Sequence, residues 1–238
     1  MRLWDVFFGV SHRLQVVPNS NWACWQCGHE EGHSLFCTSC HALQEPISDY
    51  YALLGLERKL AISADKLQQQ FYEMSRHLHP DLFTRKPERE KEYALEASST
   101  LNDAYRTLRD PVKRANYVLK QEGFDIGEQR SKDVPPELLE EVFELNMMLE
   151  ELKSGDSEAR GQLESARGNF GKMQADVDRQ LDSLFVKYDA AEPESDTAKQ
   201  ALHEIRGLLN RRRYIDNLLR DVDRALNPAA PETVEERL

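Results

Sequence analysis

The sequence predicts an all-α protein: a helical hairpin packed on a C-terminal three-helix bundle, preceded by a small cysteine-rich module. Three observations support this prediction. Apolar residues recur every three or four positions from about residue 63 to residue 226, as they do along the buried face of a helix. Prolines separate these periodic stretches, and all four cysteines lie between positions 24 and 40. The chain has 238 residues, 40% apolar and 31% charged, which suits packed helices with much exposed surface.

The charge of the chain disfavours two classes of partner. Its formal net charge is −11, and an acidic field repels nucleic acid and anionic membranes. No stretch approaches the roughly 20 apolar residues that span a bilayer. Residues 1–21 combine Arg2, Asp5 and Arg13 with a short apolar run. We expect this segment to be disordered, with a mitochondrial presequence as the alternative.

The cysteines form two Cys-x-x-Cys pairs within residues 22–44. Two such pairs supply the four thiolates of one closed tetrahedral metal site, so a structural ion is expected. Zinc is the default metal and iron the rival. A redox dithiol is disfavoured because no strand–helix context accompanies the pairs, and clustered cysteines of this kind indicate a reducing compartment. The predicted metal ligands are Cys24, Cys27, Cys37 and Cys40.

Residues 49–121 are expected to form one helical unit that begins with two capped helices. Asp49 precedes a short helix that ends at Gly55, and Ser63 precedes a second helix. Pro80 ends the second helix, because the residue before a proline avoids the helical conformation.

A third helix pairs with the second after a loop over residues 81–87. It begins near Pro87, which suits a first helical turn, and it ends at Asp110-Pro111. A short helix from about residue 112 to residue 121 follows. The faces expected to meet in the hairpin are Leu67, Phe71, Met74 and Leu78 on one helix and Ala94, Ala97, Leu101, Ala104 and Leu108 on the other.

The corner between these two helices carries the tripeptide His79-Pro80-Asp81. Together with Asp49-Tyr50-Tyr51 and the run from Asn102 to Leu108, it resembles the J domain over about residues 49–110. The resemblance implies a loop that binds a seventy-kilodalton heat-shock chaperone and stimulates its ATP hydrolysis. Asp81 would accept hydrogen bonds from an arginine of that chaperone, while Pro80 and His79 hold the loop. The alternative is that His79 and Asp81 only cap helix ends.

The positive charge near this corner departs from the pattern of many J domains. Gln68, Gln69 and Gln70 occupy the middle of the second helix, where basic residues are usual. Steering toward an acidic partner is therefore expected to be weaker, or shifted to the loop. The residues expected to contact the chaperone are His79, Pro80, Asp81, Arg76, Arg85 and Lys86.

Residues 122–134 are expected to form a linker, residues 135–227 the three-helix bundle and residues 228–238 a loose tail. The first bundle helix has two apolar stripes, of which a core needs only one. The second stripe is edged by glutamates, which predicts a partner-binding face unless both stripes pack internally. The core stripe is Leu138, Val142, Leu145, Leu149 and Leu152, and the second stripe is Leu139, Phe143 and Met147. The other two helices are expected over about 156–188 and 194–226. Their predicted apolar stripes are Leu163, Ala166, Phe170, Met173, Val177, Leu181, Leu184 and Tyr188 on the first, and Leu202, Ile205, Leu209, Ile215, Leu219 and Val222 on the second.

From about residue 22 to residue 226 the chain resembles the iron–sulfur cluster assembly co-chaperones of the HscB type. The resemblance rests on the run from Asn102 to Pro111, on Tyr117-Val118-Leu119, and on the two cysteine pairs, which match longer, metal-binding members. It implies a protein that is not an enzyme. Its bundle would bind the iron–sulfur scaffold protein and its J domain would recruit the chaperone, so that ATP hydrolysis promotes cluster transfer.

The same resemblance assigns the scaffold-binding face to the first bundle helix. Met147 stands where some members have a polar residue. For the tetracysteine module the sequence allows three roles: anchoring the N-terminus, mediating a homodimer, or sensing metal. The scaffold-binding residues carried over by position are Leu139, Glu140, Phe143, Glu144 and Met147.

Two other functions fit parts of the sequence. One is a general J-domain adaptor whose bundle binds other client proteins. The other is a cysteine-knuckle protein that acts in redox chemistry or on nucleic acid, which the net charge disfavours. The compartment expected from the cysteines is bacterial cytoplasm, with the mitochondrial matrix as the alternative.

Overall fold

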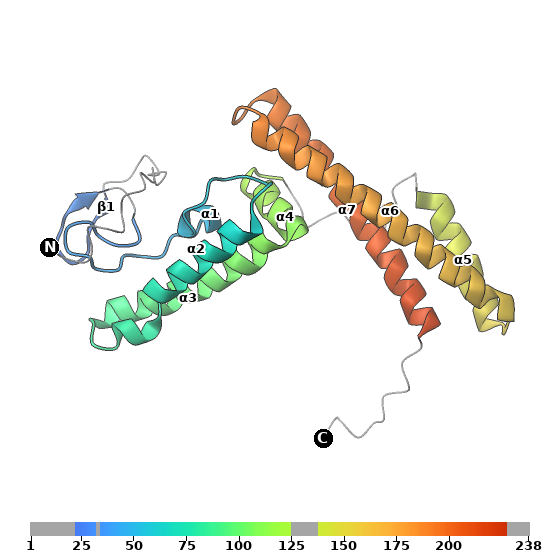
Figure 1. Ribbon diagram of the computed structural model, residues 1–238, viewed down its shortest axis with the longest axis horizontal. Helices are drawn as coiled ribbons and strands as arrows, with labels where there is room; N and C mark the ends of the chain where they lie inside the picture. Colours follow the sequence, from blue (N-terminus) through green and yellow to red (C-terminus); the bar gives the residue numbers. More distant parts are fainter. Residues whose placement is uncertain (1–21, 32–33, 125–137, 228–238) are drawn as a thin grey trace, which may run out of the picture. The chain divides into compact units, whose positions relative to one another are not determined.

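The computed structural model describes residues 22–31, 34–124 and 138–227, and Figure 1 shows an all-α protein, as predicted. Its β structure in the described part is one antiparallel pair of two-residue strands, β1 and β2, in which Trp22 faces Glu31, and one isolated bridge between Phe36 and Leu43. The elements in chain order are β1 Trp22–Ala23, β2 Glu30–Glu31, α1 Tyr50–Leu53, α2 Ala64–His77, the 3-10 turn η1 Pro80–Phe83, α3 Glu88–Arg109, α4 Pro111–Gln121, α5 Leu139–Lys153, α6 Ser157–Ala190 and α7 Asp196–Leu226.

The chain divides into two compact units between Tyr117 and Val118. The first contains the cysteine-rich module and the helices from α1 into α4, and the second contains α5, α6 and α7. Three predicted segments lie wholly or largely outside the described residues: the N-terminal segment 1–21, the linker 122–134 and the tail 228–238.

Side-chain caps place the helix starts where the sequence predicts them. The Asp49 carboxylate accepts a hydrogen bond from the Ala52 amide at 2.8 Å, and the Ser63 hydroxyl accepts one from the Lys66 amide at 3.4 Å. Each satisfies a backbone N–H that the first turn of a helix leaves unpaired. Asp110 does the same for α4, where it accepts from two amides at 2.9 and 3.0 Å.

Helices α2 and α3 pack as the predicted antiparallel hairpin. The alanine-rich face of α3 is fully buried, because small side chains let the two helices approach closely. Leu67 of α2 and Leu78, the C-terminal cap of that helix, are buried as well, and the ring of Phe71 stacks on Tyr105 at 4.3 Å between centroids. This rigid pair of helices carries the corner at residues 79–81.

One boundary of the hairpin differs from the prediction. Residues 81–87 are not all loop, since η1 forms one 3-10 turn over Pro80–Phe83 and buries Phe83. The proline supplies the helical φ of the first position, and Phe83 anchors the turn against the hairpin. The predicted start of the bundle at residue 135 lies outside the described residues, within which α5 begins at Leu139.

In the second unit, α6 contacts both α5 and α7 along its length, so the three helices form the predicted bundle. The cores of α6 and α7 follow the predicted registers, with Leu163, Val177, Ile205 and Ile215 almost completely buried. Phe185 is also buried, although the predicted stripe on α6 omits it.

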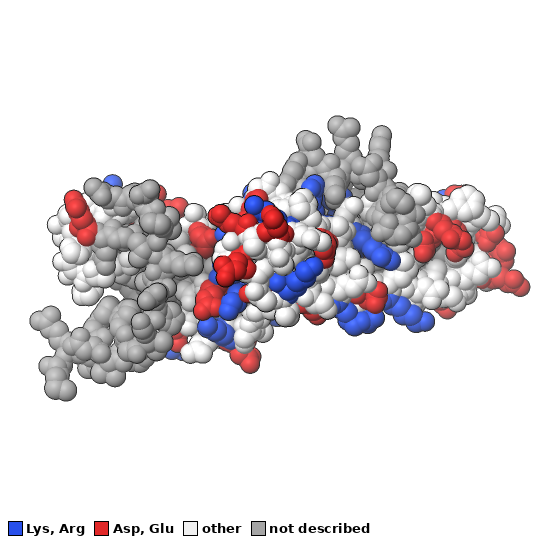
Figure 2. Space-filling view, turned by 90° about the horizontal axis from the view of Figure 1, so that it is seen from above, with Lys and Arg blue, Asp and Glu red and all other residues white. Residues whose placement is uncertain are grey.

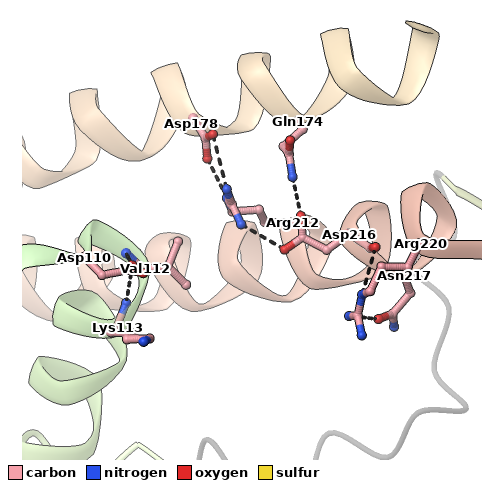
Figure 3. A network of polar contacts seen from close by, with 9 residues as sticks. All are labelled: Asp110, Val112, Lys113, Gln174, Asp178, Arg212, Asp216, Asn217 and Arg220. Carbon is pink, nitrogen blue, oxygen red and sulfur yellow. Dashed lines mark hydrogen bonds and ion pairs between the residues drawn. The ribbon is translucent and has the colours of Figure 1, made fainter. Parts of the chain in front are cut away.

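A polar network joins α6 to α7 beside this core, as Figure 3 shows. Arg212 donates to Asp178 of α6 at 2.6 Å and to Asp216 of its own helix at 2.8 Å. Gln174 of α6 also donates to Asp216. The Arg212 side chain is only 21% exposed, so this member of the arginine run at 211–213 is not a solvated side chain.

Replacing Arg212 with alanine should destabilise the bundle by about 1.5 kcal/mol, because it leaves two partly buried carboxylates without their shared cation. Arg224→Ala on the same helix is the matched control. Its pair with Asp221 is long, at 3.5 Å, and exposed, so the expected cost is below about 0.5 kcal/mol. Urea unfolding followed by circular dichroism measures both. An equal loss in the free energy of unfolding for the two variants would show that the network does not hold α6 to α7.

Candidate functional site

The cysteine-rich module is built from two tight turns that each present a Cys-x-x-Cys pair. In the first turn the Cys24 amide donates to the His29 carbonyl, and the Gly28 amide donates back to the Cys24 carbonyl, both at 2.9 Å. Gly28 has a φ of 73°, a conformation that glycine adopts without strain. The second turn repeats the pattern, with the His41 amide donating to the Cys37 carbonyl at 2.9 Å.

The two turns bring all four predicted metal ligands together. The sulfur atoms of Cys24, Cys27, Cys37 and Cys40 lie within 4.8 Å of one another. Cys24 and Cys40 are 3.6 Å apart, and Cys27 and Cys37 are 3.8 Å apart. These distances exceed the roughly 2.05 Å of a disulfide bond. They match the spacing of about 3.8 Å between thiolates that surround one ion tetrahedrally at about 2.3 Å. The donor set therefore fits a single metal ion.

Two of these thiols have pKa values far from the ordinary range. Burial opposes ionisation of Cys24, but hydrogen bonds from the Cys27 and Gln26 amides and the neighbouring sulfurs outweigh it and lower the pKa to about 6. A backbone hydrogen bond at Ala42 favours the Cys40 thiolate, but burial and the three other sulfurs raise its pKa to about 12. The Cys40 thiol thus resists ionisation, and a bound cation would remove that resistance.

The corner at residues 79–81 presents two polar side chains to solvent. His79 is 60% exposed and Asp81 is 83% exposed. The Nδ1 atom of His79 accepts a hydrogen bond from the Asp81 amide at 3.3 Å and lies 3.6 Å from the Asp81 carboxylate. The His79 carbonyl accepts from the Leu82 amide at 2.9 Å. The histidine therefore orients the turn while the aspartate carboxylate points outward.

The backbone entering this corner is held by α3. The Ser98 hydroxyl donates to the Leu78 carbonyl at 2.8 Å, which satisfies one of the free carbonyls at the end of α2. Leu78 itself is fully buried. Arg76 is exposed on the last turn of α2, and Arg85 and Lys86 are exposed between η1 and α3. All six residues expected to contact a chaperone thus lie on or beside one corner.

The second apolar stripe of α5 is exposed in the bundle. Leu139 is 54% exposed, Phe143 66% and Met147 49%, whereas Leu138 and Leu145 of the core stripe are buried. Glu140 and Glu144 are also exposed on this helix. Large apolar side chains in a row are unusual on a free surface, and this row has acids at its edge.

Three residues in or beside the candidate site were missed by reasoning from the sequence. Glu90 is a carboxylate that is only 2% exposed, Trp25 donates its indole N–H to the Leu43 carbonyl at 2.7 Å, and Leu82 is 59% exposed beside the corner. Leu82 follows Asp81 directly, so the tripeptide could have drawn attention to it. Glu90 and Trp25 act across 47 and 18 residues of sequence, and no local pattern marks such contacts.

Charged side chains are spread over the surface. On the face that Figure 2 shows, acidic and basic groups of the described residues are interspersed rather than gathered by sign.

None of the described helices is both long enough and apolar enough to cross a membrane.

Comparison with known proteins divides the chain in the same way. Residues 49–117 match the DnaJ domain, and residues 134–223 match the HSCB C-terminal oligomerisation domain. The iron-sulfur cluster co-chaperone protein HscB of Mus musculus is 29% identical over 201 residues, which cover 82% of this chain and 79% of the mouse protein. The Homo sapiens protein of the same name is 35% identical over 137 residues, which cover 55% of this chain and 58% of the human protein.

A solved structure gives the same result in three dimensions. The crystal structure of human co-chaperone protein HscB superposes with a TM-score of 0.66 and 26% sequence identity. The match covers 87% of this chain and 100% of the human chain. The likeness therefore extends through both units.

Proposed function

Because this chain belongs to the HscB type of J-domain co-chaperones, we propose that it brings an iron–sulfur scaffold protein to a seventy-kilodalton heat-shock chaperone and stimulates the ATPase of that chaperone. One observation carries the proposal. A single chain joins an exposed His-Pro-Asp corner, in a DnaJ domain, to an exposed apolar stripe edged with acids, in an HSCB C-terminal domain. Its role is that of an adaptor rather than an enzyme, since the ATP is hydrolysed on the partner.

The chaperone end acts through a preformed charge. The Asp81 carboxylate is exposed and can accept two parallel hydrogen bonds from an arginine of the chaperone. Little conformational entropy is lost on binding, because His79, Pro80 and the Ser98 anchor already hold the turn. Arg76, Arg85 and Lys86 surround the corner with positive charge and steer it toward an acidic surface.

The scaffold end acts through apolar area. Phe143 lies at the middle of the stripe between Leu139 and Met147, and an exposed aromatic side chain at the centre of a patch is a typical anchor for a partner. Glu140 and Glu144 supply the polar rim and disfavour acidic partners. A general J-domain adaptor, whose bundle binds other clients, is the alternative. It would show no dependence on the scaffold.

The module is proposed to hold one structural zinc ion through Cys24, Cys27, Cys37 and Cys40, with iron as the rival. A structural ion of this kind replaces a hydrophobic core in a segment too small to have one. Such thiolates persist in a reducing compartment, for which we propose the bacterial cytoplasm, with the mitochondrial matrix as the alternative. A homodimer, formed through the module or the bundle, also fits the oligomerisation domain that the chain matches.

The purified chain should contain about one zinc ion, and Cys37→Ser should lose most of it, because three thiolates hold zinc far less tightly than four. His29→Ala is the matched control. His29 lies in the same module but is exposed and outside the sulfur cluster, so its loss should leave the metal content unchanged. Elemental analysis of each variant decides between the metals. One iron per chain would replace zinc in this account, and full metal in Cys37→Ser would refute the site.

The function itself is tested by the ATPase rate of the chaperone. The rate is measured with the co-chaperone alone, with the scaffold alone and with both. Stimulation that the scaffold increases supports an adaptor between the two partners. Stimulation that is the same without the scaffold supports the general adaptor instead.

A further inference from the structure

The cysteine-rich module contacts the first turn of α3 through the backbone of Leu43 and the ring of Trp25. The Leu43 amide donates to the Glu90 carboxylate of α3 at 3.2 Å, and the Leu43 carbonyl accepts from the Trp25 indole at 2.7 Å. The Arg89 guanidinium lies over the Trp25 ring, 5.4 Å from its centroid. Leu43 is completely buried and Glu90 is 2% exposed. We call these four residues the module contact.

The module contact is continuous with the sulfur cluster on one side. Gln44, next to Leu43, is buried, and its side-chain Nε2 atom donates to the Cys24 sulfur at 3.4 Å and to the Ala42 carbonyl at 2.8 Å. Trp25 itself lies between Cys24 and Cys27 in the sequence. The position of the Leu43 backbone therefore depends on the fold of the two cysteine turns. In so small a module that fold depends in turn on the bound ion.

On the other side, the module contact is continuous with the corner at residues 79–81. The Lys86 amide donates to the Phe83 carbonyl of η1 at 2.9 Å, and the Glu90 amide donates to the Pro87 carbonyl at 3.0 Å. The Lys86 ammonium lies 3.9 Å from the Glu90 carboxylate. Asp81 lies in η1 and is thus separated from Glu90 only by the rest of that turn and a short link to α3. Any loosening of the first turn of α3 is expected to reach the corner.

Glu90 makes this contact an energetic link rather than a chance one. A buried carboxylate is stable only where hydrogen bonds and opposite charge compensate for its lost hydration. The Leu43 amide and Lys86 are the compensation that the structure shows. If the module loses its fold, the amide is lost and Glu90 has to reach water, which pulls the first turn of α3 out of its packed position.

We propose that metal binding by the tetracysteine module stabilises the chaperone-binding corner, and that Glu90 transmits the effect. That the corner at residues 79–81 binds a chaperone rests on the proposed function, whereas the coupling between the corner and the metal site does not. Coupling between two sites is reciprocal, so a change at Glu90 has to alter metal affinity, although Glu90 is not a ligand. Loss of the ion would lower the activity of the co-chaperone without any change in the His-Pro-Asp residues.

The first test is the zinc affinity of the full-length chain, measured by competition with a chromophoric chelator under reducing conditions. Glu90→Ala should weaken zinc binding about tenfold, within the usual range of coupling between sites. Glu90→Gln keeps an acceptor for the Leu43 amide and should weaken it by less than about threefold. Glu88→Ala, an exposed acid in the same turn, is the control and should change nothing. Zinc affinity within twofold of wild type for Glu90→Ala overturns the proposal.

The second test needs no variant that might fail to fold. Hydrogen exchange of the wild-type chain is compared with zinc bound and after its removal by a chelator with the thiols kept reduced. Amides of residues 81–92 should exchange about tenfold faster without the ion, while amides of α7 keep their rates. Unchanged exchange at residues 81–92 contradicts the coupling. Neither test contains a chaperone, so either result stands apart from the outcome for the proposed function.

Discussion

Replacing His79 with glutamine should reduce stimulation of the chaperone ATPase at least about tenfold, to near the unstimulated rate. The Nδ1 atom of the imidazole accepts a hydrogen bond from the Asp81 amide and keeps the Asp81 carboxylate pointing outward. A glutamine side chain is longer and more flexible, so it holds this turn poorly and the arginine-accepting geometry is lost. Single-turnover ATP hydrolysis by the chaperone measures the effect directly.

His77→Gln is the matched control for this variant. His77 is also exposed, on the last turn of α2, but its side chain makes none of the hydrogen bonds described for the corner. Its replacement should leave stimulation within twofold of wild type. The helix content of both variants should equal that of the wild type, because neither side chain is buried. A fully active His79→Gln variant would remove the J-domain assignment of the corner.

Replacing Phe143 with alanine should weaken scaffold binding by about 2 kcal/mol, which is roughly a thirtyfold rise in Kd. Phe143 is 66% exposed, so its truncation costs the bundle little stability, and the loss falls on the interface. Stimulation of the chaperone without scaffold should be unchanged, since the corner lies in the other unit. Isothermal titration calorimetry with the scaffold gives the affinity.

Val186→Ala is the control for Phe143→Ala. Val186 is an apolar residue on α6 with a similar exposure of 62%, and it lies outside the predicted stripe. It should bind the scaffold as the wild type does. If Phe143→Ala lost both scaffold binding and scaffold-independent stimulation, the side chain would have a structural role instead. Equal weakening by Val186→Ala would place the interface elsewhere on the bundle.

Local features of the fold could be predicted from the sequence because their physics is local. Asp49 and Ser63 cap their helices as expected, since a cap needs only the next three residues. The alanine face of α3 is buried as a whole, because the spacing of its residues places them all on one side of the helix. The convergence of the four cysteines could also be predicted. Each Cys-x-x-Cys pair lies in a tight turn, and the tetrahedral site of one ion needs both pairs.

Contacts between segments could not be predicted in this way. Glu90 reads as one of many acids on α3, and only the fold brings the Leu43 amide to it. Arg212 belongs to a run of three arginines, and only the packing of α6 on α7 selects it for Asp178. Phe185 is buried although it falls outside the expected stripe, because a helix as long as α6 meets two partners. In each case the deciding neighbour is 34 residues or more away, or on another helix.

The proposed adaptor and the proposed metal effect together describe a protein that stimulates its chaperone fully only when two conditions hold. The scaffold has to occupy the stripe on α5, and the module has to hold its ion. Each condition acts on a different unit of the chain and has its own test.

The central claim is tested most directly by the steady-state ATPase rate of the chaperone with saturating wild-type protein, with saturating scaffold, and with both. The account predicts that the rate with both exceeds the sum of the two separate stimulations, because one chain presents the scaffold and the corner to the same chaperone. Phe143→Ala should lose this excess at a scaffold concentration near the wild-type Kd. A rate equal to the sum of the separate effects would contradict the account.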